Sequence, residues 1–197
     1  RFKADKFHLC ITTQCQVYKP SRPNKNIKHA IKETSNQVLV HKGQPINAFY
    51  HASNGGISAA SSESWNMNDY PYLLSNLDLA KPSNEYKTYT IREEISLMNF
   101  LKEDKNNFFG KDHYLFRWKK QLSSQQLKDL LVKNDLINNN SEIENFKVIE
   151  RGMSGRVKKL EISQVNSTRK IILVKDEIRK YLNFLPSNLF IINKLND

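Results

Sequence analysis

The C-terminal third of the chain contains three short segments rich in β-branched and aromatic residues. Apolar residues recur over 146–149, 157–162 and 171–174, and Arg151-Gly152 stands between the first two segments. Segments of this length and composition are typical of β-strands. A helical pattern over 176–182 follows, and LFII from Leu189 is predicted to form a last strand. We therefore expect an α+β fold of mixed, mainly antiparallel sheets with a few helices.

The preceding part of the chain alternates turn signals with short periodic segments. Lys42 and Gly43 separate two apolar stretches, which predicts a hairpin, because glycine permits the positive φ of a tight turn. Two capping-box patterns, TIRE from Thr90 and SSQQ from Ser123, each open an apolar helical pattern. We expect a helix over 27–33, strands over 38–40 and 46–50, helices after 90 and 123, and a strand or loop over 114–120. These elements predict one domain over 1–197, with a helical insertion or lobe at about 90–140.

Composition limits the class of protein. The 197 residues are 39% hydrophobic and carry a formal charge of +11, with a pI near 9.6. No apolar run is long enough to cross a bilayer. The positive charge favours an anionic partner such as nucleic acid, phospholipid or an acidic wall polymer. The basic residues are scattered among Asn, Glu and Asp, so we do not expect nucleic acid to be the partner.

Two cysteines, Cys10 and Cys15, lie close together in the sequence. Their odd separation places them on opposite faces of an extended strand, so any joint role needs a turn around 12–14. Three alternatives remain open: a small disulfide loop, part of a zinc site with a histidine such as His8, or two reduced thiols.

The segment FYHASNGGISAASSESW, residues 49–65, holds the only adjacent glycines, Gly55 and Gly56. Their position after a predicted strand indicates either a tight turn or a close approach of the backbone to a ligand. His51 and Ser53 share a strand face, but no orienting carboxylate accompanies them. The sequence lacks the spacing of a phosphate-binding loop, HExxH, GxSxG and paired CxxC motifs.

Several blocks in series resemble the SpoIID domain of stage II sporulation protein D and the LytB amidase-enhancer proteins. The blocks are CITTQCQVY, AFYHASNGG with SSESW, DYPYL, RGMSGRVKKLEI and EIRKYLNFLPSNLF. The resemblance implies an exported protein of the periplasm or cell envelope that acts on peptidoglycan. In its better-known members, the family is a lytic transglycosylase that cuts glycan strands without stem peptides.

The resemblance also implies that parts of the family pattern are missing. The family's glutamate, taken as the general acid/base, precedes the cysteine segment and would stand upstream of Arg1. A Gly/His-rich segment normally follows the last strand, and Gln14 stands where many members carry histidine. We therefore expect a partial, catalytically incomplete domain. Cleavage of the glycosidic bond needs a carboxyl group with a raised pKa, and Glu63 and Asp69 are the carboxylates to test as substitutes. The alternative for both is a surface or capping role.

The remaining candidate residues fit a groove for a saccharide. Trp65, Tyr70 and Tyr72 can stack on apolar sugar faces, and arginines of RGMSGR can hold an anionic lactyl or phosphate group. The alternatives are core burial for Trp65 and capping of a strand end for the arginines. The predicted substrate-binding residues are Gln16, His51, Ser53, Asn54, Gly55, Gly56, Trp65, Tyr72, Arg151, Ser154 and Arg156. The alternative function is a non-catalytic wall-binding module or an enhancer of a cell-wall amidase.

Overall fold

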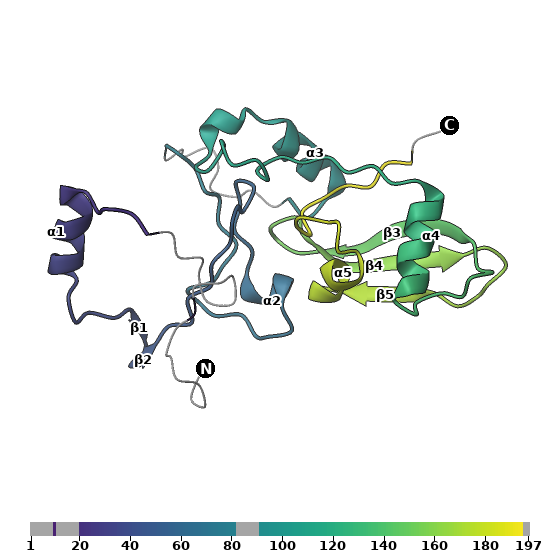
Figure 1. Cartoon of the computed structure of the whole chain (residues 1–197), viewed down its shortest axis with the longest axis horizontal. Coiled ribbons are helices and arrows are strands. Elements are labelled where there is room, and N and C mark those ends of the chain that lie inside the picture. The colour runs from purple at the N-terminus through teal and green to yellow at the C-terminus, as the bar shows by residue number, and fades with distance from the viewer. Residues whose placement is uncertain (1–9, 11–19, 82–90, 195–197) are drawn as a thin grey trace. The chain divides into compact units, whose positions relative to one another are not determined.

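The computed structural model describes residues 10, 20–81 and 91–194 (Figure 1). The chain divides into two compact units, Arg1–His51 and Ala52–Asp197, and each is described by itself. Among the described residues, no helix has both the length and the apolar character needed to span a membrane.

The Arg1–His51 unit contains one helix and one very short hairpin. Helix α1 (Lys25–Glu33) begins after Asn24, whose side chain accepts the backbone N–H of Ile27 at 2.9 Å. Strands β1 (Val40–His41) and β2 (Gln44–Pro45) pair antiparallel around Lys42 and Gly43, which have φ values of 50° and 76°. The predicted helix and turn are confirmed.

The predicted strand over 46–50 is wrong, because residues 46–50 form no ladder. The apolar side chains of this hairpin also remain at the surface, with Val38, Leu39 and Val40 exposed by 72%, 75% and 57%. Because these side chains stay exposed, their burial does not stabilise a longer ladder. The hairpin is therefore limited to two residues on each strand.

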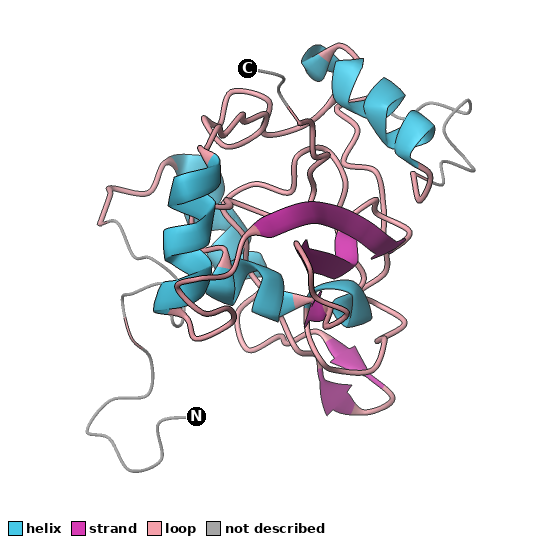
Figure 2. Ribbon diagram, turned by 90° about the vertical axis from the view of Figure 1, so that its right-hand side faces the viewer, coloured by secondary structure: helices cyan, strands magenta, loops and turns pink. Residues whose placement is uncertain are grey.

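The Ala52–Asp197 unit is organised around a three-stranded antiparallel sheet. Strands β3 (Ile143–Arg151), β4 (Val157–Gln164) and β5 (Ile171–Val174) are arranged in the order β3-β4-β5. Side chains alternate along β4, and Leu160 and Ile162 are fully buried. Figure 2 shows these strands in magenta among helices and long loops.

Two helices contribute apolar side chains to the hydrophobic cluster on the buried face of this sheet. Helix α4 (Ser124–Lys133) opens with the predicted capping box between Ser123 and Gln126 and contributes Leu131. Helix α5 (Asp176–Tyr181) contributes Ile178 to the same cluster. The predicted α+β class with antiparallel sheets is confirmed.

A second hydrophobic cluster forms beside the sheet from aromatic and aliphatic side chains. Helix α3 (Glu94–Lys102) contributes Leu97 and Phe100, and Phe100 meets Phe108 edge-on at 5.4 Å between ring centroids. The helix α2 (Ser61–Ser64) and the 3-10 helix η2 (Lys105–Asn107) are the other helical segments described. Helices α3 and α4 therefore pack into different clusters, although both lie in the region predicted as one lobe.

One local prediction is wrong, one is decided between its two alternatives, and one lies outside the described residues. LFII from Leu189 forms no strand, although Leu189 and Phe190 are buried. The segment 114–120 is a loop, which was one of its two alternatives. Thr90 of the first capping box lies outside the described residues, and α3 begins after Glu93 without a side-chain cap.

Candidate functional site

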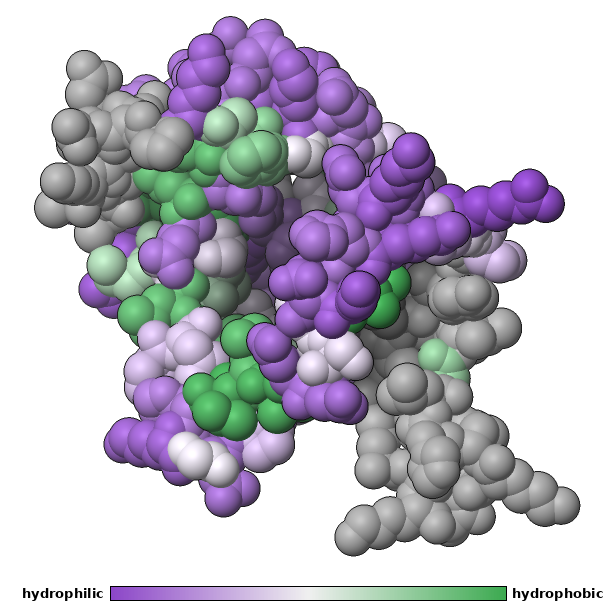
Figure 3. All heavy atoms as spheres, turned by 90° about the vertical axis from the view of Figure 1, so that its left-hand side faces the viewer, coloured by the Kyte–Doolittle hydropathy of each residue, from purple (hydrophilic) through white to green (hydrophobic). Residues whose placement is uncertain are grey.

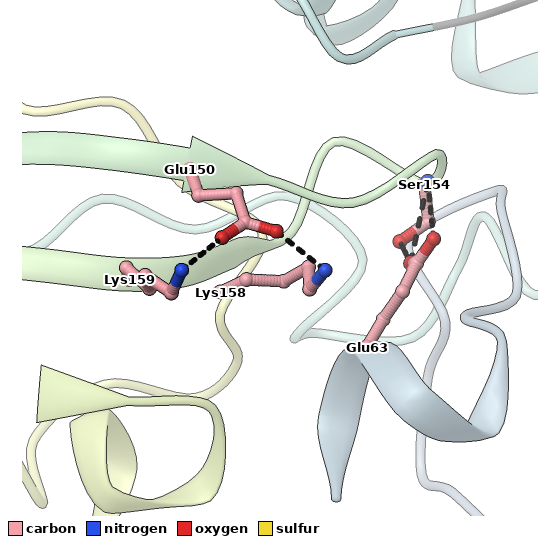
Figure 4. Close-up of polar contacts among 5 residues, drawn as sticks. All are labelled: Glu63, Glu150, Ser154, Lys158 and Lys159. Atoms are coloured by element: carbon pink, nitrogen blue, oxygen red, sulfur yellow. Dashed lines mark hydrogen bonds and ion pairs between the residues drawn. The ribbon is translucent and has the colours of Figure 1, made fainter. Parts of the chain in front are cut away.

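A buried carboxylate connects two segments that are far apart in the sequence. Glu63 lies on α2 and is only 4% exposed. Both of its carboxylate oxygens accept the backbone N–H of Ser154 at 3.3 Å, and Oε2 also accepts the Ser154 hydroxyl (Figure 4). Burial of a carboxylate is costly unless hydrogen bonds replace its water. These bonds therefore compensate the burial of Glu63 and attach α2 to the turn between β3 and β4.

The glycines of RGMSGR allow this turn to close around the carboxylate. A Cβ on Gly152 would lie 2.4 Å from Cδ of Glu63. Gly155 has a φ of +76°, and a Cβ there would lie 2.9 Å from the carbonyl oxygen of Ile91. Neither position has room for a side chain, so the motif encodes a close approach of the turn to α2 and to residue 91.

Arg156, the last residue of the RGMSGR turn, binds the backbone of the segment that precedes α2. Its guanidinium donates to the carbonyl oxygens of Ile57 at 3.0 Å and Asn54 at 2.9 Å. Burial lowers the pKa of Arg156 to about 10, while the negative charge of Glu63 acts in the opposite direction. The guanidinium thus stays protonated at neutral pH and balances the buried charge of Glu63.

Arg151 has a structural role at the segment that was predicted as the last strand. Its Nη1 donates to the carbonyl oxygens of Gly155 at 3.0 Å and Phe190 at 2.8 Å. Burial lowers its pKa, and the charge of Glu94 partly offsets that effect. The backbone at Phe190 is thus held by an arginine side chain, and binding of an anionic group by these arginines stays a prediction.

The Gly55-Gly56 pair forms a turn packed beneath aromatic side chains. Both glycines have positive φ values, +68° and +95°, and a Cβ on Gly56 would lie 2.9 Å from Cδ1 of Phe108. Asn54 fixes the turn, because its Oδ1 accepts the N–H of Gly56 at 2.9 Å and its Nδ2 donates to Asp78 at 2.8 Å. The glycine pair thus forms the tight turn that was one of its two alternatives, and contact of its backbone with a ligand stays a prediction.

Arg117 completes the packing around the glycine turn and was not singled out from the sequence. Its Nη1 donates to the carbonyl oxygen of Gly55 at 2.6 Å. Its guanidinium carbon lies 4.4 Å from the ring centroid of Phe116 and 5.2 Å from that of Phe100. Burial lowers the pKa of Arg117. The sequence signal for this residue was an arginine between aromatic residues in YLFRWKK. Its partners Gly55 and Phe100 are distant in the sequence, so the spacing of residues did not predict these contacts.

An aromatic turn, residues 65–72, follows α2 directly. Trp65 is 37% exposed, and the half-buried rings of Tyr70 and Tyr72 stack with their centroids 5.3 Å apart. Ser61 fixes this turn, because its hydroxyl donates to the carbonyl oxygen of Asn68 at 3.0 Å and accepts the N–H of Tyr70 at 3.2 Å. The predicted stacking residues therefore share one turn that is bonded to the helix bearing Glu63.

Two carboxylates, Asp69 in the aromatic turn and Glu150 in the β3–β4 hairpin, are held by hydrogen bonds or ion pairs. Asp69 accepts the backbone N–H of Ser62 at 3.0 Å, and hydrogen bonding with Ser62 lowers the pKa of Asp69. Glu150 on β3 pairs with Lys158 at 2.5 Å and Lys159 at 2.7 Å (Figure 4). Hydrogen bonds from these two lysines lower the pKa of Glu150 to about 2. Both carboxylates are thus ionised at neutral pH.

The other predicted site residues are dispersed or lie outside the described residues. His51 is exposed and belongs to the Arg1–His51 unit, whereas Ser53 is half-buried and its hydroxyl accepts the N–H of Gly55 at 3.3 Å. Cys10 is half-buried. Gln16 and Cys15 fall outside the described residues, so the three cysteine alternatives stay open. Among the residues that are described, no three His, Cys, Asp or Glu side chains are grouped to hold a metal ion.

Comparison with known proteins divides the chain at about the same place as its two compact units. Residues 59–197 match the family described as Domain of unknown function (DUF8618). The chain belongs to this family. The DUF8618 match includes α2, the aromatic turn and the RGMSGR turn, and therefore most of the candidate site. No solved structure matches the chain.

The N-terminal residues carry a different match. Residues 1–41 match the family described as Stage II sporulation protein. The amidase enhancer of Bacillus subtilis (strain 168) is 39% identical over 71 residues, which are 36% of this chain and 10% of that protein. The SpoIID relationship is confirmed, and the chain spans about a tenth of the curated relative that it matches. The later blocks of the resemblance, from SSESW onward, fall within the DUF8618 match.

Proposed function

We propose that this chain is a cell-envelope module that binds peptidoglycan glycan strands through its aromatic turn. The observation that carries this proposal is the stacked pair Tyr70 and Tyr72 on the turn that begins with the exposed Trp65 and is fixed to α2. The SpoIID relationship and the amidase enhancer among its relatives favour a role in the wall. An exported protein, in the periplasm or cell envelope, is part of the same proposal.

The arrangement of the turn suits recognition of a sugar. Aromatic rings provide an apolar surface for the C–H face of a sugar ring. Stacking of the two faces restricts the orientations that the bound sugar can adopt. Hydrogen bonds from Ser61 and the attachment of Glu63 to Ser154 fix the turn before any ligand arrives. A site that is already ordered loses less entropy on binding.

Glu63 is assigned a positioning role in this proposal and not that of an acid/base catalyst. Its oxygens are occupied by the N–H and hydroxyl of Ser154, and the side chain is 4% exposed. A general acid must come within hydrogen-bond reach of the glycosidic oxygen. If the intact protein is a SpoIID-like lytic transglycosylase, the described residues hold the glycan and another carboxylate transfers the proton.

Binding of purified glycan strands lacking stem peptides tests the proposal. Replacement of an exposed aromatic anchor by alanine in a small interface typically weakens binding by about tenfold. We expect that loss for Trp65→Ala, measured by co-sedimentation with glycan strands. The matched control is Tyr114→Ala, an aromatic residue that is 81% exposed elsewhere in the same unit. Equal binding by Trp65→Ala and the parent chain would exclude the aromatic turn as the site.

A second candidate function, enhancement of a cell-wall amidase, is favoured by the name of the matched relative, the amidase enhancer. In that case the chain raises the rate of a purified amidase on isolated walls without releasing sugar itself. Addition of the chain to such an assay, with Trp65→Ala alongside, separates the two functions. Stimulation that survives Trp65→Ala would indicate contact with the amidase in place of the glycan.

A further inference from the structure

The positive charge of the protein is concentrated in its first quarter. Residues 1–51 contain nine lysines and arginines against two acidic residues, a formal charge of +7 out of the chain's +11. The Ala52–Asp197 unit, nearly three times as long, carries the remaining +4. A charge density this uneven favours an anionic partner for the Arg1–His51 unit in particular.

Helix α1 presents apolar and basic side chains on different sides of one short helix. Ile27 and Ile31 are four residues apart, so they lie on one face, and they are exposed by 49% and 63%. Lys25, Lys28 and Lys32 lie outside this apolar stripe. None of the residues of α1 is buried. The helix is therefore amphipathic, and its apolar face packs against no core in the described part of the chain.

Further apolar side chains reach the surface of the same unit. Val38, Leu39 and Val40 are exposed by 72%, 75% and 57%, in a hairpin too short to bury them. Figure 3 shows apolar side chains in green at the surface, next to hydrophilic ones in purple. Exposed apolar residues grouped with charges are typical of surfaces that bind a partner.

We propose that α1 docks on an anionic phospholipid surface, with Ile27 and Ile31 entering the headgroup region and the lysines contacting lipid phosphates. A short basic amphipathic helix is the element that binds in this way. A soluble polyanion, such as duplex DNA or a polymer of glycerol phosphate, would use only the lysines. The two exposed isoleucines favour the bilayer, because their transfer from water into lipid is favourable. This inference is independent of glycan binding by the other unit.

Co-sedimentation of the full chain with lipid vesicles tests this surface. The probe is a vesicle of equal parts phosphatidylglycerol and phosphatidylcholine, compared with one of phosphatidylcholine alone. We expect binding to the first, weakened by salt, and little to the second. Lys28→Gln with Lys32→Gln should reduce binding by about 25-fold, since each lysine near an anionic surface contributes about fivefold.

The isoleucines separate a bilayer from a soluble polyanion. Ile27→Ser with Ile31→Ser should weaken vesicle binding by at least about tenfold and leave binding to duplex DNA or poly(glycerol phosphate) unchanged. Matched controls in the other unit are Ile95→Ser, at a residue that is 73% exposed, and Lys102→Gln with Lys105→Gln, at two exposed lysines. Neither control should change vesicle binding.

Two results would overturn the inference. One is equal binding to neutral and anionic vesicles. The other is vesicle binding that the isoleucine replacements leave intact, which would show attraction through charge alone. An unchanged circular dichroism spectrum establishes that each variant is folded.

Discussion

Two glutamates at the β3–β4 hairpin, Glu63 and Glu150, differ in their burial and in the kind of group that stabilises them (Figure 4). Glu63 is 4% exposed and is held by uncharged donors of Ser154, in a turn that leaves no space at Gly152. The side chain of Glu150 is 29% exposed and is held by the charges of Lys158 and Lys159. Removing a partner from a buried group leaves it unsatisfied, whereas water and salt replace a partner at the surface. Stability should therefore depend on the turn much more than on the ion pairs.

The largest effect is expected for Gly152→Ala. Its Cβ would lie 2.4 Å from Cδ of Glu63, so the turn or α2 must shift, at a cost of about 3 kcal/mol in the free energy of unfolding. Urea denaturation followed by tryptophan fluorescence measures this cost. Gly110→Ala is the control, because nothing lies within 4 Å of its Cβ and only its φ of +69° is strained, at about 1 kcal/mol. Equal losses for the two variants would contradict the steric argument.

An intermediate effect is expected when the contact between α2 and the turn is cut. Glu63→Gln and Ser154→Ala should each lower the free energy of unfolding by about 2 kcal/mol, because each leaves buried polar atoms incompletely paired. The double variant should lose clearly less than the two single losses combined, since both remove the same interaction. Additive losses would show that the two side chains do not act together.

The smallest effect is expected for Glu150→Gln, at no more than about 1 kcal/mol near neutral pH. The folded-state pKa of Glu150 is lowered from 4.5 to about 2, so its ionised form is favoured by folding. Its contribution is complete above pH 4.5 and is lost as the pH falls toward 2. Stability measured across this range should fall more steeply for the parent than for Glu150→Gln. Parallel curves would exclude the ion pairs as a source of stability.

Apolar segments predicted the strands correctly in the β3–β4 hairpin but not in the β1–β2 hairpin. Apolar residues predicted strands on both sides of Lys42-Gly43, as they did on both sides of the RGMSGR turn. Strands β3 and β4 extend over nine and eight residues because helices α4 and α5 bury one face of the sheet. Strands β1 and β2 have two residues each, and the apolar side chains there stay exposed. A strand pattern predicts a ladder only where something covers it.

The sequence by itself determined the local features: the glycine turns, the capping box at Ser123, the α1 and α4 helices and the antiparallel strands from 143 to 174. Each of these depends on residues close together in the chain, so its signal is readable from spacing. Only the tertiary structure decided that Glu63 meets Ser154, that Arg117 binds the carbonyl oxygen of Gly55, and that Arg151 holds the backbone at Phe190. Such contacts form between segments that are far apart in the sequence and that are brought together by the packing of the two hydrophobic clusters. The spacing of residues along the chain therefore does not predict them.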